Sequence, residues 1–277
     1  MVTWHTYVEP NGLHNITGLL LEDDAVWSPQ LQNQRPILVA LPPEYASTNQ
    51  HYPVIYMHDG QNLFDVATSY AGEWHVDETL QLLSQEGLPA IIVGIPNMGA
   101  QRIKEYSPFN DAHFGGGKGN LYLQYIMETL KPLIDHDFRT LPEREHTGLI
   151  GSSMGGLISL YGFFRYATTF GLTGVMSPSL WFAQGAITSY ITKARFQPGR
   201  LYLDMGGREG PPSTLSRLAP GELSRSLLSA RRLYQLLQKK GYRVGHDLLY
   251  VEAPEGVHNE AAWAQRLPDA LRFLLRD

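Results

Sequence analysis

The sequence predicts an α/β fold with a mostly parallel central sheet and helices on both faces. Short apolar, β-branched runs alternate with longer amphipathic segments along the chain, which is the order typical of parallel strands joined by helices. The run 90–95 is apolar throughout, as expected of a strand covered on both faces. A glycine-flanked turn at 151–155 joins another apolar run to an apolar helical segment. These observations together predict strands buried between two layers of helices.

Apolar runs bounded by turn residues predict the strands of this sheet. They are expected at 36–41, 52–58, 90–95, 147–150, 173–177, 200–205 and 246–252. Pro42-Pro43 should end the first strand and Asp59-Gly60 the second, because both pairs favour turns. The N-terminal stretch through Leu21 is expected to add antiparallel strands at one edge.

Apolar residues at helical spacing predict the connecting helices. They are expected at 74–84, 121–138, 156–164, 222–240 and 260–275. Pro132 should kink the second of these, because its ring removes an N–H donor and clashes with the preceding turn. The stretches 97–120 and 206–221 are expected to be long loops over the strand ends, where open α/β sheets bind ligands.

Composition is that of a globular protein and argues against several kinds of partner. The 277 residues are 43% hydrophobic and contain neither repeats nor a low-complexity linker, so a single domain over 1–277 is expected. A net charge of -5 and the lack of long basic runs disfavour nucleic acid as a partner. The sequence does not indicate an oligomeric state.

The sequence also argues against a membrane segment and against cysteine chemistry. No apolar stretch reaches the roughly 18 residues that a membrane span needs, and the N-terminus lacks a signal-peptide pattern. A cytoplasmic location is therefore the default expectation. The chain has no cysteine, which excludes disulfides, thiolate metal sites and a cysteine nucleophile.

The pentapeptide Gly151-Ser152-Ser153-Met154-Gly155 matches the pattern Gly-x-Ser-x-Gly between a strand and a helix. A turn this tight strains the central serine, and glycines on either side avoid clashes. Ser153 is the centre of the pattern and hence the candidate nucleophile, whereas Ser152 lacks the flanking glycines. The N–H of Met154, at the start of the helix, should face a developing oxyanion.

A serine hydroxyl needs a base, and in α/β-hydrolases a histidine follows the nucleophile along the chain. Only His246 and His258 follow Ser153. His246 opens an expected strand, whereas His258 lies between the last strand and the last helix, where the base is expected. His258 is therefore the candidate base; the alternative is an ordinary surface histidine near a helix start.

The acid should lie between the serine and the histidine, on the loop after a strand. Asp204 lies inside an expected strand, and Glu209 lies on the glycine-rich turn just past it. Glu209 is favoured, because a carboxylate that orients an imidazole needs freedom to reach Nδ1. Asp204 remains the alternative, and either carboxylate could instead be solvated or paired with Arg208.

A second oxyanion donor is expected on the loop after an early strand. The segment His58-Asp59-Gly60-Gln61-Asn62 occupies this position, so the Gln61 amide is the candidate donor. His58 and Asp59 could alternatively bind a metal. No further His, Asp or Glu cluster at ligand spacing accompanies them, so neither a metal nor a cofactor is expected.

These residues give the chain a resemblance to the putative esterase (esterase D-like) family of α/β-hydrolases, and within it to the enterochelin-esterase-like branch. The matching blocks are 52–65 (YPVIYMHDGQNLFD), 91–109 (IIVGIPN through EYSPF), 148–161 (GLIGSSMGGLISLY), 175–182 (VMSPSLWF) and 258–263 (HNEAAW). The resemblance implies an α/β-hydrolase fold, with Ser153 as nucleophile, His258 as base, and Gln61 and Met154 as oxyanion donors. The family's acid position falls on Glu209, although many relatives carry aspartate there.

The implied function is that of a serine carboxylesterase, which hydrolyses a small-molecule ester through an acyl-enzyme intermediate. The alternatives are an acyltransferase with the same triad and a non-catalytic binding protein on a hydrolase fold. Aromatic and basic residues are candidates for the substrate pocket: Tyr70, Trp74, Tyr106, Trp181 and Arg102, with Phe114, Phe182, Lys104 and Arg208 in addition. The alternative is core packing for each aromatic residue and a solvated surface charge for each basic one.

Overall fold

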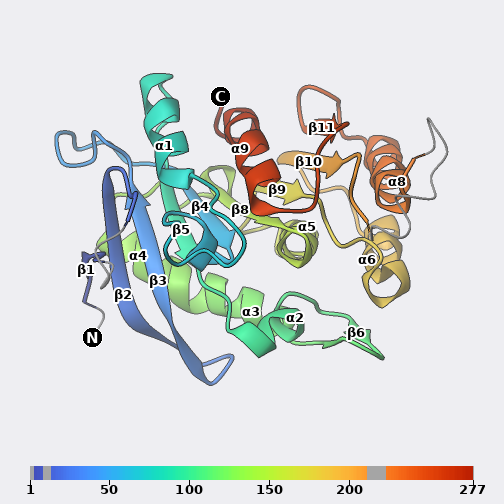
Figure 1. Ribbon diagram of the computed structural model, residues 1–277, viewed down its shortest axis with the longest axis horizontal. Coiled ribbons are helices and arrows are strands. Elements are labelled where there is room, and N and C mark those ends of the chain that lie inside the picture. Colours follow the sequence, from blue (N-terminus) through green and yellow to red (C-terminus); the bar gives the residue numbers. More distant parts are fainter. Residues whose placement is uncertain (1–2, 9–13, 211–222, 277) are drawn as a thin grey trace.

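The computed structural model describes residues 3–8, 14–210 and 223–276. Within these residues the centre is a nine-stranded sheet in the order β1-β2-β3-β5-β4-β8-β9-β10-β11 (Figure 1). The strands from β5 to β11 in this order run parallel to one another. β1, β2 and β3 add an antiparallel edge. The mostly parallel sheet predicted from the sequence is therefore confirmed.

The strands lie close to their predicted positions. They are β1 (His5–Thr6), β2 (Leu19–Ser28), β3 (Asn33–Leu41), β4 (Val54–His58), β5 (Ile91–Ile95), β8 (Thr147–Ser152), β9 (Leu172–Met176), β10 (Arg200–Gly206) and β11 (Leu248–Ala253). The antiparallel edge is also present, but β2 continues to Ser28, past the predicted N-terminal stretch.

Helices cover both faces of the sheet. They are α1 (Val76–Gln85), α2 (Arg102–Glu105), α3 (Gly119–Tyr125), α4 (Lys131–Asp137), α5 (Met154–Arg165), α6 (Phe182–Lys193), α8 (Arg225–Lys240) and α9 (Glu260–Leu275). Ile55 and Met57 of β4 share a buried cluster with α1 and α9, whereas Val54 and Tyr56 share another with α3, α5 and α8. This alternation follows from the two-residue period of a strand, and it confirms the predicted two-sided α/β fold.

The helix predicted over 121–138 is interrupted just before Pro132. A π-helical turn, Ile126–Leu130, separates α3 from α4, and Pro132 lies in the first turn of α4. Because proline cannot donate a backbone hydrogen bond, the preceding turn widens. The break expected at Pro132 therefore takes the form of a π turn.

α6 has no counterpart among the predicted helices. Its first residues, Ala183, Gln184 and Gly185, have positive φ angles, and polar residues interrupt any apolar stripe along it. The predicted loop 97–120 is also partly structured, since it contains α2 and a small hairpin of β6 (Asn110–Asp111) and β7 (Gly115–Gly116).

Of the predicted loop 206–221, residues 211–221 lie outside the described residues. Among the helices that the structure describes, none is long and apolar enough to cross a membrane. Short 3₁₀ turns lie at Gly60–Asn62, Gly99–Gln101 and Arg144–His146.

Candidate active site

Ser153 lies in the sharp turn between β8 and α5. Its backbone has φ 56° and ψ -118°, a sparsely populated conformation that a serine adopts only under strain. A Cβ atom on Gly151 would lie 2.8 Å from the backbone carbon of Gly155 and 2.8 Å from Cδ2 of His58. The turn therefore closes only with glycine at this position, as the sequence pattern predicts.

A chain of hydrogen bonds joins Ser153, His258 and Glu209. His258 Nε2 lies 3.0 Å from Ser153 Oγ, and His258 Nδ1 lies 2.7 Å from Glu209 Oε2. The His258 ring packs edge-on against Trp263 of α9, with 4.9 Å between ring centroids. The His258 side chain is 41% exposed and that of Glu209 only 2%, so the imidazole reaches solvent while the carboxylate is shielded.

Glu209 is held by the turn that follows β10. Its Oε1 accepts hydrogen bonds from the Ser177 hydroxyl at 2.5 Å and from the Gly206 N–H at 2.8 Å. This turn packs directly on the segment after β11, because a Cβ on Gly207 would lie 2.3 Å from the carbonyl oxygen of Pro254. Glycine lets the ends of two neighbouring strands approach, which brings the Glu209 carboxylate to His258.

Asp204, the alternative acid, has other partners. Its carboxylate accepts hydrogen bonds from Arg266 at 2.8 and 3.2 Å and from the Ser177 N–H at 2.9 Å. Burial raises the pKa of Asp204, and the Arg266 guanidinium opposes this rise. Glu209, and not Asp204, is thus the carboxylate in contact with His258.

Gln61 and Met154 belong to the turns that follow β4 and β8. Gln61 belongs to the 3₁₀ turn after β4 and lines a cavity together with Ser153 and His258. Met154 is the first residue of α5. Backbone N–H groups in the first turn of a helix have no partner within that helix, so these two amides are suited to receive a negatively charged oxygen.

The turn that carries Gln61 is tightly fixed. Asp59 has a left-handed backbone with φ 58°, and a Cβ on Gly60 would lie 2.6 Å from the Pro96 nitrogen. Arg102 donates to both Asp59 carboxylate oxygens at 2.7 Å. Arg102 therefore serves chiefly to hold this turn.

His58 is buried beneath the same turn. Its Nδ1 lies 2.8 Å from the Tyr122 hydroxyl, and burial lowers the pKa of His58 to about 3, so the ring is neutral. The Asp59 carboxylate forms an ion pair with Arg102. The interpretation of His58 and Asp59 as metal ligands therefore gains no support from their contacts.

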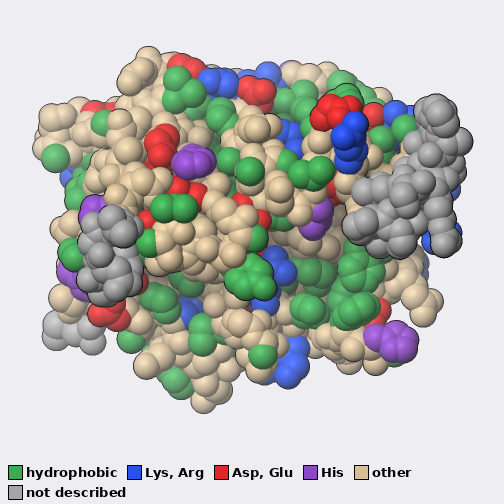
Figure 2. All heavy atoms as spheres, viewed as in Figure 1, with side chains coloured by type: hydrophobic (Ala, Val, Ile, Leu, Met, Phe, Trp, Pro, Cys, Tyr) green, Lys and Arg blue, Asp and Glu red, His purple; other side chains and the backbone are tan. Residues whose placement is uncertain are grey.

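Two cavities meet at Ser153 and His258, and these two residues line both. The smaller has a volume of about 550 Å³ and its walls include Pro178, Leu180, Trp181, Met205 and Arg225. The larger has a volume of about 940 Å³ and its walls include Gln61, Tyr70, Trp74, Asn97 and Arg102. Figure 2 shows hydrophobic side chains gathered between α6 and the β6–β7 hairpin, where exposed Phe114 packs edge-on against Trp181.

Four of the five candidate pocket residues lie on these walls: Tyr70, Trp74 and Arg102 on the larger, Trp181 on the smaller. Tyr106 lines neither cavity, so the expectation that it belongs to the substrate pocket is wrong. It is fully buried beside His58, and its hydroxyl accepts the Asp59 N–H at 3.0 Å, so it supports the turn from inside. Among the described residues, neither wall includes Phe114, Phe182, Lys104 or Arg208.

Two residues near the centre were not among the predicted ones. Ser179 Oγ lies 3.1 Å from Ser153 Oγ. Arg266 lies on the buried face of α9, next to Leu267 and one turn from Trp263. A charged residue within an apolar helical stripe is the sequence signal that could have identified Arg266.

Comparisons with known proteins bear on both the fold and the family. The profile of the family described as "Putative esterase" matches residues 28–274. The uncharacterized protein YbbA of Bacillus subtilis is 28% identical over 243 residues, which cover 84% of this chain and 90% of that protein.

Solved structures show the same fold. The BES protein from Bacillus cereus has a TM-score of 0.72 at 23% identity, with 99% of this chain and 100% of that chain covered. An IroE-like serine hydrolase from Shewanella oneidensis has a TM-score of 0.70 at 23% identity, covering 95% and 80%.

The enterobactin esterase FES from Shigella flexneri has a TM-score of 0.70 at 20% identity, and the match covers 91% of this chain but 58% of that one. The α/β-hydrolase fold expected from the sequence is thus shared with solved esterases. Because the family profile spans most of the chain, the protein belongs to the putative esterase family and is an ester hydrolase.

Proposed function

We propose that the protein is a serine carboxylesterase in which Ser153, His258 and Glu209 act as nucleophile, base and acid. The observation that carries the proposal is the unbroken chain of hydrogen bonds from Ser153 through both His258 nitrogens to Glu209, at 3.0 and 2.7 Å. A base within hydrogen-bond reach of a hydroxyl, itself oriented by a third group, is the arrangement that activates serine.

In the first half-reaction Glu209 accepts the N–H of His258 Nδ1, which leaves Nε2 free to accept a proton. Ser153 Oγ attacks the ester carbonyl carbon while Nε2 takes its proton, and Glu209 stabilises the resulting imidazolium. The carbonyl oxygen becomes an oxyanion that accepts the N–H groups of Gln61 and Met154. Each such donor is expected to contribute about 3 kcal/mol, roughly a hundredfold in rate.

His258 Nε2–H then donates its proton to the leaving alcohol, and the acyl group remains bonded to Ser153 Oγ. In the second half-reaction water takes the place of the alcohol. Nε2 accepts a proton from the water as it attacks the acyl carbon, and returns it to Ser153 Oγ as the acid departs. The exposed face of His258 gives this water a route to the acyl-enzyme.

The substrate in this proposal is a small-molecule ester whose two halves occupy the two cavities. Leu180, Trp181 and Met205 favour an apolar group in the cavity of about 550 Å³. The neighbouring cavity of about 940 Å³ has polar groups from Asn97 and Thr68 on its wall and suits a larger, more polar portion.

Hydrolysis of p-nitrophenyl acetate, butyrate and octanoate by wild-type protein and Ser153→Ala tests this mechanism. Wild-type turnover should fall to background in the variant. Retained turnover in Ser153→Ala would overturn the assignment of the nucleophile.

Covalent labelling by a fluorophosphonate probe gives a second readout. Ser152→Ala is the matched control, because it removes the neighbouring hydroxyl of the same turn and should leave labelling intact. Added alcohols test the alternative in which an alcohol, and not water, accepts the acyl group. Ester formation faster than hydrolysis would assign the protein as an acyltransferase.

A further inference from the structure

A cluster of acidic side chains surrounds the start of α1, outside the site described above. Glu73, His75 and Glu78 each offer one ligand atom, and these atoms lie within 4.8 Å of one another. His75 Nδ1 lies 3.6 Å from Glu73 Oε2 and 3.3 Å from Glu78 Oε1. Ligand atoms about 2.1 Å from a tetrahedral ion lie about 3.4 Å apart, so the spacing around His75 matches that of a metal site.

Both carboxylates of this cluster contain a buried oxygen that lacks a partner. Glu73 Oε1 and Glu78 Oε2 are buried and accept no hydrogen bond from the described residues, and the Glu73 side chain is only 1% exposed. A buried carboxylate oxygen without a donor is costly. The oxygens that face His75 are the other two, Glu73 Oε2 and Glu78 Oε1, so each carboxylate keeps a second, buried oxygen that a positively charged ligand would satisfy.

Two more carboxyl groups, those of Asp65 and Asp77, lie beside the cluster. Asp65 Oδ2 and Asp77 Oδ1 are also buried without a hydrogen-bond partner, and Asp65 interacts electrostatically with Glu73. In the described part of the chain, no lysine or arginine forms an ion pair with any of these four carboxylates. Among the side chains described here, His75 is the basic partner of Glu73 and Glu78.

Neighbouring donors orient two of the carboxylates. The Asn15 amide donates to Glu73 Oε2 at 2.6 Å, and the backbone and hydroxyl of Thr17 donate to Asp77 Oδ2 at 2.5 and 3.1 Å. Hydrogen bonds of this kind commonly orient the carboxylates that bind metals. The Glu73 carboxylate is thereby held in a fixed orientation.

We propose that Glu73, His75 and Glu78 bind a divalent metal ion, through one carboxylate oxygen from each glutamate and Nδ1 of His75. One imidazole with carboxylates suits Zn²⁺ better than Ca²⁺, which prefers oxygen ligands alone. The His75 and Glu78 side chains are 54% and 39% exposed, so the ion has a route from solvent. The sequence alone predicts no metal ion at these residues.

The ion would brace the wall of the larger cavity. Trp74 lies between two of the ligands and lines that cavity. The backbone N–H of Trp74 donates to the Asn62 carbonyl at 2.9 Å, and the backbone N–H of Val76 donates to the Leu63 carbonyl at 3.0 Å. Binding would thus link the start of α1 to the turn that carries Gln61. The role is structural and goes beyond the proposed esterase activity.

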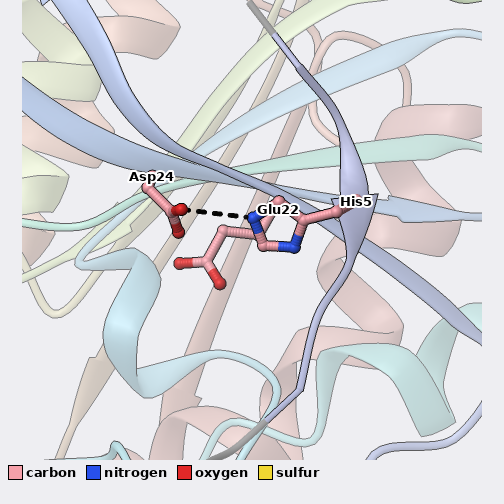
Figure 3. Close-up of side chains that lie close together, drawn as sticks. All are labelled: His5, Glu22 and Asp24. Atoms are coloured by element: carbon pink, nitrogen blue, oxygen red, sulfur yellow. Dashed lines mark ion pairs between the residues drawn. The ribbon is translucent and has the colours of Figure 1, made fainter.

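A second group on the same protein provides the matched control. His5, Glu22 and Asp24 also bring ligand atoms within 4.8 Å (Figure 3). Here the His5 and Asp24 side chains are 47% and 77% exposed. In the part of the chain that the structure describes, this group has no buried oxygen without a partner. The same residue types without burial should not bind an ion firmly.

The test is calorimetric titration of chelator-treated, full-length protein with Zn²⁺, together with thermal unfolding. Wild type should bind with micromolar or tighter affinity and unfold at a higher temperature with Zn²⁺. His75→Asn should weaken one equivalent of binding at least about tenfold, and asparagine tolerates the left-handed backbone of His75 (φ 54°). Glu78→Gln, at the partly exposed second glutamate, should also weaken one equivalent of Zn²⁺ binding.

His5→Asn should bind Zn²⁺ as wild type does. Absence of saturable binding, or unchanged binding in both His75→Asn and Glu78→Gln, would overturn the proposal. A loss confined to His5→Asn would assign the ion to the exposed group instead, and firmer binding of Ca²⁺ than of Zn²⁺ would rule out the imidazole as a ligand. None of these readouts depends on esterase activity.

Discussion

Arg266 of α9 donates to both carboxylate oxygens of Asp204, at 2.8 and 3.2 Å. The same guanidinium donates to the Ser177 hydroxyl at 3.0 Å, and Ser177 donates in turn to Glu209 at 2.5 Å. A buried ion pair therefore lies directly behind the carboxylate that contacts His258. Through Ser177, the last helix is linked to the proposed acid.

Replacing Arg266 by methionine should destabilise the fold, because the Asp204 carboxylate would stay buried without its partner. The expected loss is about 3–5 kcal/mol in the free energy of unfolding, measured by urea denaturation. Arg272→Met is the control on the same helix. Its half-exposed pair with Glu86 should contribute about 0–1 kcal/mol, so equal losses in the two variants would contradict the role of the buried pair.

Glu209→Gln should leave the protein folded but lower kcat by about 10⁴-fold, because a neutral amide neither fixes the His258 tautomer nor stabilises the imidazolium. Steady-state kinetics on p-nitrophenyl butyrate measure this. Asp204→Asn should act mainly through stability, since Asp204 contacts Arg266. The assignment fails if Asp204→Asn abolishes turnover in a stable protein while Glu209→Gln remains active.

Buried His58 should make stability depend on pH. Burial lowers the pKa of His58 to about 3, against about 6.5 in an unfolded chain. Below pH 6.5 the unfolded state binds a proton that the folded state does not. The stabilisation due to neutral His58 is therefore complete above about pH 6.5 and declines toward pH 3, by up to about 1.4 kcal/mol per pH unit.

Urea denaturation at several pH values between about 4.5 and 7 measures this dependence. His58→Gln keeps a polar group near the Tyr122 hydroxyl and removes the titration. The variant should lose less stability than wild type as the pH falls. Parallel curves for the two proteins would show that other groups control the acid transition.

Gly151 and Gly155 should differ in their tolerance of a methyl group. A Cβ on Gly151 would meet backbone at 2.8 Å, whereas on Gly155 the nearest atom, His58 Cβ, is 3.3 Å away. Gly151→Ala should therefore cost about 1–3 kcal/mol or more and abolish turnover, because the serine turn must shift. Gly155→Ala should cause a smaller loss of stability, measured by thermal unfolding, and a smaller loss of turnover, measured by steady-state kinetics. The reverse order would contradict the geometry of the turn.

Much of the architecture could be predicted because local patterns determine it. Local sequence determines β5, because its apolar run favours a buried strand. The glycines around Ser153 likewise favour a tight turn. α6 escaped prediction because its first residues have left-handed backbone, which no apolar period indicates. Its position depends on packing that only the assembled fold supplies.

For the candidate site, chain order and turn chemistry indicated Ser153, His258 and Glu209, which the fold brings into one chain of hydrogen bonds. The prediction of Tyr106 as a pocket residue is wrong, because no sequence pattern indicates that its hydroxyl accepts the Asp59 N–H. Arg266 was missed because its partner Asp204 lies 62 residues away in the sequence. Contacts of this kind depend on how distant segments meet.

The dependence of the site on α9 also governs when it can form during synthesis. N-terminal segments leave the ribosome first and begin to fold there, so the turn at Ser153 emerges well before His258 and Arg266. A nascent chain at that stage has the Ser153 hydroxyl but neither the proposed base, His258, nor Arg266 behind the proposed acid. The growing protein should thus remain inert toward esters until α9 docks.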